Sequence, residues 1–243
     1  NSLTDRLQTT EDALRRFVSD ASHELKTPLA GIRLLTDSIL QTDHMDEATT
    51  KEFVTDIGRE AERLSRITEN LLRLTRLDSG VVQQPYPVAV RPVLERVERM
   101  LTMVAQEKGV TVSGAADEDA VALATDDDVH QILYNLMENA IKYSAAEGGF
   151  VRAEAHVDGD KVVLTVSDNG IGIPNEDLPH IFDRFYRVDK MRSREVGGTG
   201  LGLSIVKDTI ENRGGTISAG HGANGVGTVF TVYMPLAERG EEA

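Results

Sequence analysis

A histidine on a predicted helix is the first residue whose surroundings could support chemistry. Apolar residues across positions 14–39 recur at alternating spacings of four and three, which predicts one long amphipathic helix. That repeat places His23 on the face opposite the apolar seam, with Glu24 beside it and Thr27 one turn on. A neutral imidazole displayed in this way could act as a nucleophile. The same pattern also fits a solvated histidine, and the spacing does not choose between the two.

Asparagine, lysine and tyrosine gather on one face of a second predicted helix. In the segment NLMENAIKY, Asn135, Asn139 and then Lys142 or Tyr143 recur at intervals that bring them to the same side. Asparagine oxygens suit a hard cation such as Mg²⁺, and a lysine suits a phosphate. The alternative is an ordinary polar helix face.

A glycine-containing turn follows a predicted strand at residues 162–167. The turn, DNGIGIP, begins with Asp168, which could accept a hydrogen bond from the exocyclic amine of adenine. Gly170 and Gly172, which flank Ile171 and precede Ile173, would let the base approach the backbone. The same residues are also typical of a simple Asp-Asn-Gly turn.

Two further segments could contact phosphate groups. The segment IFDRFYRV at residues 181–188 carries Arg184 and Arg187 among aromatic residues that could equally belong to the core. The segment GGTGLGL at residues 197–203 leads into a predicted helix, where a glycine-rich turn would present backbone N–H groups to an anion. It matches neither the dinucleotide-binding fingerprint nor the P-loop.

The elements that position these residues divide the chain into two parts. Residues 1–80 contain three of the 21 glycines and carry a second apolar stripe over residues 53–74 after a polar turn at residues 41–46. Two such helices predict an antiparallel hairpin. Each seam would remain half uncovered, so we expect a homodimer that forms a four-helix bundle. Pro28 is expected to kink the first helix just past His23.

The second part mixes strands and helices without regular alternation, which favours an α+β sandwich over a doubly wound parallel sheet. A proline-rich stretch at residues 81–92 predicts a linker that runs into a first strand. The predicted strands are 110–112, 151–156, 162–167 and 228–234, and the predicted helices are 93–106, 127–142 and 203–212.

Composition excludes several classes of function. The chain has 40 acidic against 26 basic residues and a net charge of −14, so nucleic acid and anionic lipid are not expected as general partners. It has no cysteine, which rules out disulfides, thiolate metal sites and a cysteine nucleophile. No apolar run approaches the ~20 residues that a membrane-spanning helix needs.

Taken in order, the motifs resemble those of one known family. Residues 17–29, FVSDASHELKTPL, resemble the phosphoacceptor box of sensor histidine kinases almost letter for letter. The four later segments resemble the N, G1, F and G2 boxes of the histidine kinase catalytic domain, and the segment GVGT at residues 225–228 resembles its last glycine box. That domain has the Bergerat (GHKL) ATP-binding fold, which is shared with gyrase-type topoisomerases, a heat-shock chaperone and a mismatch-repair protein.

The resemblance implies roles for individual residues. His23 would accept the γ-phosphoryl group of ATP, Glu24 would act as general base or orienting carboxylate, and Thr27 would position water for dephosphorylation of a response regulator. Asn139 would be the main Mg²⁺ ligand and Asn135 a possible second; unlike the glutamate of Bergerat hydrolases, Asn135 cannot activate water. The residues expected at the nucleotide are Asn135, Asn139, Lys142, Tyr143, Asp168, Gly170, Gly172, Ile173, Arg184, Arg187, Gly198, Thr199, Gly200, Leu201, Gly202 and Thr228.

The resemblance also divides the chain and implies partners. Residues 1–13 resemble the end of a HAMP signalling helix, although an ordinary helix extension would look the same. The expected mobile lid, residues 188–198, carries Lys190, Arg192 and Arg194. The implied partners are a second copy of the hairpin and the receiver domain of a response regulator. The expected ranges are 14–80 for dimerisation and phosphotransfer, 81–92 for the linker and first strand, 86–237 for catalysis and 238–243 for the tail.

These features predict the cytoplasmic part of a bacterial membrane sensor kinase, with membrane contact only through segments outside this chain. Two other classes stay open at this point. One is a Bergerat-fold ATPase, which the histidine box and the missing water-activating glutamate disfavour. The other is a non-catalytic dimeric scaffold that binds ATP as a structural ligand.

Overall fold

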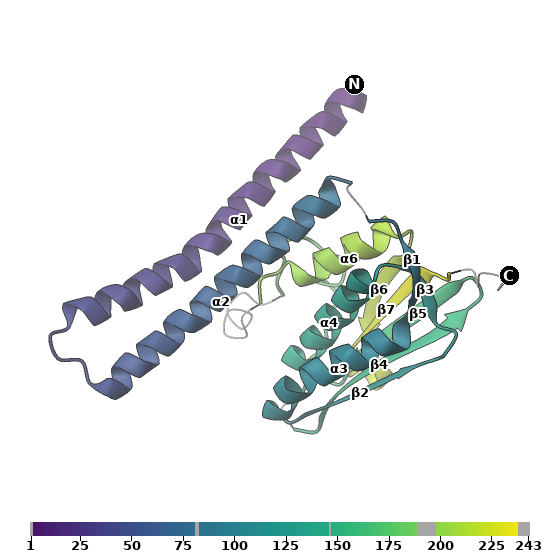
Figure 1. Cartoon of the computed structure of the whole chain (residues 1–243). Helices are drawn as coiled ribbons and strands as arrows, with labels where there is room; N and C mark the ends of the chain where they lie inside the picture. Colours follow the sequence, from purple (N-terminus) through teal and green to yellow (C-terminus); the bar gives the residue numbers. More distant parts are fainter. Residues whose placement is uncertain (1, 81–82, 146, 189–197, 238–243) are drawn as a thin grey trace.

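A helical hairpin precedes a mixed α/β domain in the computed structural model (Figure 1). The first helix, α1, spans Ser2–Gln41, and the second, α2, spans Glu47–Asp78. The two helices run antiparallel and pack along each other, which confirms the hairpin predicted from the two apolar stripes. The residues that the structure describes are 2–80, 83–145, 147–188 and 198–237.

The turn between the helices is defined by a capping residue. Asp46 is the N-cap of α2, and its Oδ1 accepts a hydrogen bond from the backbone N–H of Thr49 at 2.9 Å. This bond satisfies one of the donors that the first helical turn leaves unpaired. Helix α1 stays helical through Pro28, which is buried, and Figure 1 shows its axis changing direction along its length.

Part of the apolar surface of the hairpin lies uncovered in the single chain. Leu14 and Val18, both on the predicted seam, are 60% and 55% exposed. Leu29 on α1 and Val54 on α2 are exposed to a similar degree. A second hairpin could bury this apolar surface, as the expected homodimer requires. Burial of such side chains is the main driving force for association.

The second domain is built on a five-stranded sheet in the order β2-β4-β5-β7-β6. Only the β2–β4 pair is parallel; the other neighbours are antiparallel. A separate antiparallel pair joins β1 to β3. The strands are β1 (Tyr86–Ala89), β2 (Val110–Ala116), β3 (Val121–Ala124), β4 (Gly149–Asp158), β5 (Lys161–Asp168), β6 (Thr216–His221) and β7 (Thr228–Pro235).

Three helices cover one face of this sheet, which confirms the predicted α+β sandwich (Figure 1). They are α3 (Val90–Glu107), α4 (Asp126–Tyr143) and α6 (Gly202–Asn212). Strand β4 alternates buried and exposed residues, so its buried set faces the helices. The core contains, among others, Val97, Leu101, Ile132, Leu136, Val151, Leu164, Val206 and Val232.

The predicted boundaries differ from the structure where local signals are weak. Helix α3 begins at Val90 rather than Val93, because Pro92 falls in the first turn, where no backbone donor is needed. Strand β2 continues to Ala116, and strands β3 and β6 were not predicted. These strands are short or rich in small residues, and pairing with neighbouring strands stabilises them despite a weak intrinsic preference.

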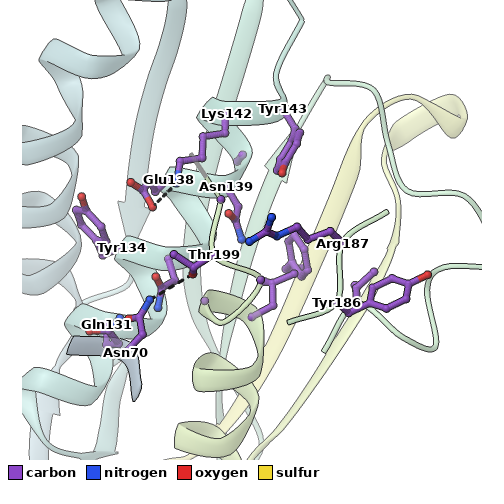
Figure 2. A pocket seen from close by; sticks show the side chains of 18 of the residues that line it. Asn70, Gln131, Tyr134, Glu138, Asn139, Lys142, Tyr143, Tyr186, Arg187 and Thr199 are labelled. Atoms are coloured by element: carbon purple, nitrogen blue, oxygen red, sulfur yellow. Dashed lines mark hydrogen bonds and ion pairs between the residues drawn. The ribbon is translucent and has the colours of Figure 1, made fainter. Parts of the chain in front are cut away.

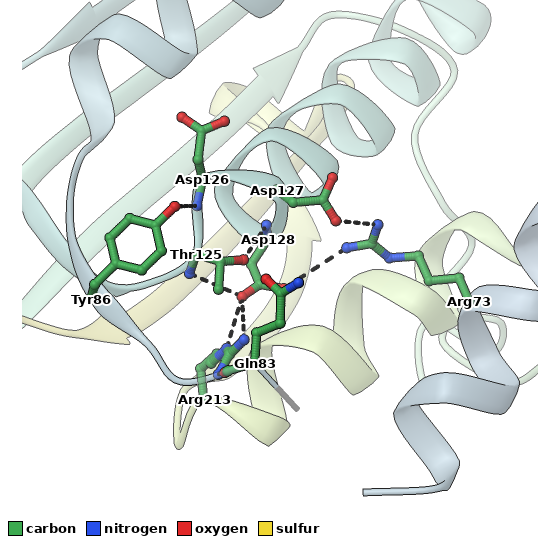
Figure 3. A network of polar contacts seen from close by, with 8 residues as sticks. All are labelled: Arg73, Gln83, Tyr86, Thr125, Asp126, Asp127, Asp128 and Arg213. Atoms are coloured by element: carbon green, nitrogen blue, oxygen red, sulfur yellow. Dashed lines mark hydrogen bonds and ion pairs between the residues drawn. The ribbon is translucent and has the colours of Figure 1, made fainter. Parts of the chain in front are cut away.

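A polar network fixes the start of α4 to the rest of the chain (Figure 3). Thr125 caps α4 in a reciprocal capping box with Asp128. Oδ2 of Asp128 also accepts a hydrogen bond from Nε of Arg213 and forms an ion pair with its Nη2, both at 2.8 Å. Arg213 in turn donates to the carbonyl oxygen of Gln83 at 2.7 Å. The N-terminal end of α4, the end of α6 and the segment after α2 are thereby tied together.

Candidate functional site

One cavity of about 890 Å³ contains most of the residues that the motifs predicted (Figure 2). It lies between α4, the turn after β5, the glycine-rich turn before α6, and one face of α2. Its size is within the range of sites for small ligands. The predicted residues that line it are Asn135, Asn139, Lys142, Tyr143, Asp168, Gly172, Ile173, Arg187, Gly198, Thr199, Gly200, Gly202 and Thr228.

Helix α4 presents its predicted polar face to this cavity. Lys142 forms an ion pair with Glu138 at 2.8 Å, and both side chains are mostly buried. Nδ2 of Asn135 is buried and has no hydrogen-bond partner in the part of the chain that is described. Figure 2 shows Asn139 and Arg187 pointing toward each other across the cavity. A buried amide without a partner is costly, so a bound ligand at this position would satisfy it.

Asp168 ends strand β5 and is held by backbone donors. Its Oδ1 accepts from the N–H of Gly170 at 2.8 Å and of Thr228 at 3.3 Å. The side chain is buried, and desolvation raises the pKa of Asp168, an effect that the two backbone hydrogen bonds oppose. Oδ2 has no partner within the described residues, so it is the oxygen available to a ligand donor.

The turn after Asp168 requires glycine because the backbone approaches closely. A Cβ at Gly170 would lie 1.9 Å from the carbonyl oxygen of Tyr143, and Gly172 has a φ of +70°. Gly170 does not line the cavity; its N–H holds Asp168 instead. Ile173 packs against the core of the domain while lining the cavity.

The second glycine-rich turn packs against the segment that carries the arginines. Gly200 has a φ of +71°, and a Cβ there would lie 2.8 Å from the backbone of Phe185. The carbonyl oxygen of Gly200 accepts from the N–H of Phe185 at 2.8 Å. Leu201 is fully buried in an apolar cluster with Leu74 and Ile205, so it supports the turn rather than lining the cavity.

The two arginines that are expected at the nucleotide lie in different places. Arg184 donates to both carboxylate oxygens of Asp78 and to Asp208, all at 2.7–2.9 Å, and does not line the cavity. These partners raise the pKa of Arg184 further above its ordinary value, the hydrogen bond to Asp78 having the largest effect. Arg187 lines the cavity and donates to Glu24 at 2.6 Å.

The histidine box lies on α1 outside the cavity. The His23 side chain is exposed, and its ring has no hydrogen-bond or ion-pair partner among the described residues. Thr27 donates its hydroxyl to the carbonyl oxygen of His23 at 3.2 Å. Two residues of this box contact the second domain: Glu24 accepts a hydrogen bond from Arg187, and the ring of Phe17 lies 5.9 Å from that of Phe185. Glu24 also accepts a hydrogen bond from Arg63 on α2.

Sequence reasoning missed the contribution of α2 to the cavity. Arg66, Asn70 and Arg73, one or two turns apart on a single face, line it together with Arg76. Asn70 donates to the hydroxyl of Thr199 at 3.4 Å, as Figure 2 shows. The polar stripe is visible in the sequence, but nothing local indicates that it faces the other domain.

Some expectations fall outside the described residues. The predicted lid is one of them, except for its ends at Val188 and Gly198, so the positions of Lys190, Arg192 and Arg194 are not described. No helix within the described ranges has the length and apolar character to cross a membrane. Those ranges also contain no group of three or more histidine or acidic side chains that could hold a metal by themselves.

The amide set nevertheless fits a Mg²⁺ ion that arrives with a nucleotide. Asn135 and Asn139 bring amide oxygens to the same cavity as the glycine-rich turn. Oδ1 of Asn135 lies close to Gly202, at 3.4 Å from the position of an added Cβ. Mg²⁺ commonly takes one or two protein oxygens and completes its shell with phosphates and water, so a cage of acidic residues is not required.

Comparison with known proteins matches both halves of the chain. Residues 13–80 match the family model of the His Kinase A (phospho-acceptor) domain. Residues 124–238 match the model of the Histidine kinase-, DNA gyrase B-, and HSP90-like ATPase. The second domain is thus an ATP-binding domain of this type.

Individual relatives agree with these models. The chain is 35% identical over 232 residues to the sensor histidine kinase WalK of Bacillus subtilis (strain 168) and 35% identical over 239 residues to the sensor protein kinase PmrB of Pseudomonas aeruginosa. The matches cover 94% and 98% of this chain but 38% and 49% of the relatives, so the chain spans less than half the length of either.

A solved structure shows the same fold. The histidine kinase ThkA, in complex with the response regulator protein TrrA, has a TM-score of 0.74 and 21% identity, over 96% of this chain and 65% of that chain. From the matched domains, their order and these relatives, we conclude that the chain belongs to the sensor histidine kinase family and comprises its phosphoacceptor and ATP-binding domains.

Proposed function

We propose that this chain transfers the γ-phosphoryl group of ATP to His23 and then passes it to an aspartate of a response regulator. The observation that carries the proposal is the position of Arg187. This side chain lines the nucleotide cavity and also reaches Glu24, the neighbour of His23. The cavity and the histidine box therefore lie within one side chain's length of each other.

The chemistry is an in-line displacement. The unprotonated ring nitrogen of His23 forms a bond to the γ-phosphorus with its lone pair. The bond from that phosphorus to the β,γ-bridging oxygen breaks, and ADP leaves with the oxygen and the bond's electrons. The proton on the other ring nitrogen then passes to Glu24 or to solvent. Little covalent assistance is needed, so positioning and charge neutralisation supply most of the catalysis.

The cavity residues would hold the nucleotide for that step. Asp168 would accept from the adenine amine through Oδ2, and the N–H groups of the turn at residues 198–202 would face the phosphates. Asn139, with Asn135, would hold Mg²⁺, which neutralises phosphate charge when bound. Because Asn135 carries an amide in place of a carboxylate, it cannot activate water, and ATP would persist until His23 attacks.

The partners follow from the exposed faces of the hairpin. A second hairpin would cover the apolar surface that includes Leu14 and Val18, giving a homodimer. The exposed face with His23 and Thr27 would then receive a response regulator. The similar kinase ThkA forms a complex with the response regulator protein TrrA. Thr27 would position water for dephosphorylation of the response regulator. The full-length protein would carry membrane-anchored sensor segments, with this part on the cytoplasmic side.

Labelling with γ-labelled ATP and Mg²⁺ tests the proposal. We expect the label to be acid-labile and base-stable, which is typical of a phosphoramidate, and to be absent from the His23→Gln variant. His44→Gln is the matched control, because His44 is an exposed histidine at the turn of the same hairpin. Label that persists in His23→Gln would overturn the assignment. Phosphate release without labelled protein would favour an ATPase.

A further inference from the structure

The carboxylate of Glu24 lies between two arginines from different parts of the chain. Its Oε2 is 3.3 Å from Nη2 of Arg63 on α2 and 2.6 Å from Nη2 of Arg187 in the second domain. Both arginines are almost fully buried, with side chains 8% and 5% exposed. Removing either arginine would leave the carboxylate with a single cationic partner, so each contact helps to hold Glu24 in place.

The contact of Glu24 with Arg63 does not depend on the position of the second domain, whereas its contact with Arg187 does. Arg63 is on the helix that packs along α1, so it stays beside Glu24 wherever the second domain lies. Arg187 belongs to the second domain and lines the nucleotide cavity, where a phosphate would compete for its guanidinium. A phosphate is a strong partner for arginine. Arg63 is therefore the partner that Glu24 keeps while Arg187 is engaged elsewhere.

Both arginines use the same oxygen. The hydrogen bonds from Arg63 and Arg187 end on Oε2, and Oε1 has none in the described part of the chain. A carboxylate held by one oxygen keeps the other in a restricted set of positions. Oε1 is thus the atom that can accept the imidazole N–H proton of the neighbouring His23.

We propose that Arg63 is a positioning residue for phosphoryl transfer: it fixes Glu24 through Oε2, so that Oε1 is presented to the His23 ring. This inference rests on the proposed phosphorylation of His23. Arg63 does not line the nucleotide cavity, so it acts through Glu24 and not through ATP. The Arg63 guanidinium is also confined by its surroundings. Its Nη1 lies 3.8 Å from Oε2 of Glu60, and its Nε is buried without a hydrogen-bond partner within the described ranges.

Initial rates of His23 labelling, measured over a range of ATP concentrations, test this role. We expect Arg63→Gln to lower the maximal rate by about 10- to 100-fold, the cost of a misplaced catalytic group, while the KM for ATP stays unchanged. Arg63→Lys, which keeps the charge, should recover part of the rate. Arg59→Ala is the control: Arg59 lies one turn earlier on α2, is 74% exposed and has Asp56 as its one ion-pair partner among the described residues.

A double-mutant cycle separates positioning from a structural effect. In a Glu24→Gln background, Arg63→Gln should cause no further loss, because its effect acts through the missing carboxylate. Light scattering and circular dichroism check that each variant keeps its dimer and its helix content. A normal maximal rate in Arg63→Gln, or an equal loss in the Glu24→Gln background, would overturn the proposal. Absence of labelling in the unmodified chain would instead contradict the proposed function.

Discussion

Replacement of Asp168 by asparagine should change which purine the site accepts. Oδ1 is committed to two backbone N–H donors, from Gly170 and Thr228, so an amide at this position must place its oxygen there. The amide NH₂ then occupies the place of Oδ2. The oxygen that we propose as the acceptor for the adenine amine is thereby replaced by an NH₂ group, which is a donor and cannot pair with that amine.

The size of the effect follows from burial, since Asp168 is 5% exposed. A hydrogen bond to a charged partner contributes about 1.5–3 kcal/mol, and a buried donor left without a partner costs about 1–3 kcal/mol more. At about 1.4 kcal/mol per tenfold, the affinity for ATP should fall by about 10²- to 10⁴-fold. The domain should remain folded, because the amide oxygen still accepts from both backbone groups.

Calorimetry with ATP and ITP measures the change. The carbonyl oxygen of hypoxanthine can accept from the introduced NH₂, so the preference for ATP over ITP should shrink or reverse. Asp160→Asn serves as control, since Asp160 is exposed just before the opposite end of the same strand. If Asp168→Asn bound ATP normally and kept the original preference, adenine recognition by Asp168 would be wrong.

Three further predictions concern pH and packing. Burial raises the pKa of Asp168 above its ordinary value of 3.8, so acidification through that raised pKa should protonate the carboxyl group. Calorimetry should then show weaker ADP binding, and Asp168→Asn should lack this part of the pH dependence. Protonation should also stabilise the folded state, because it removes a buried charge. Arg213→Ala should lower the free energy of unfolding of the second domain in urea by about 3–5 kcal/mol, because Asp128 loses its buried partner. Lys207→Ala, at a more exposed position of α6, should change this free energy little. Leu74→Ala should lower the free energy that holds the two domains together by about 2–5 kcal/mol, because Leu74 is fully buried against Leu201 and Ile205. Proteolysis between the domains should become faster, and an unchanged rate would contradict this packing role.

Local patterns were sufficient to predict most of the elements, although not β3 and β6, and most of the polar residues that line the cavity. The spacing in α4 placed Asn135, Asn139 and Lys142 on one face, and that face lines the cavity. Glycine at residues 170 and 200 marked places where the backbone approaches too closely for a Cβ. Such signals are readable because helix periodicity and backbone sterics act between residues that are near in sequence.

The partners of charged residues were decided only by the tertiary structure. Arg184 and Arg187 are three residues apart in one motif, yet one pairs with Asp78 and Asp208 while the other lines the cavity and reaches Glu24. The sequence determined that His23 lies on an exposed helix face and that a nucleotide site follows. That Arg187 reaches Glu24 and that Asn70 on α2 faces Thr199 depend on how the two domains pack, because these contacts join residues more than a hundred positions apart that no local pattern relates.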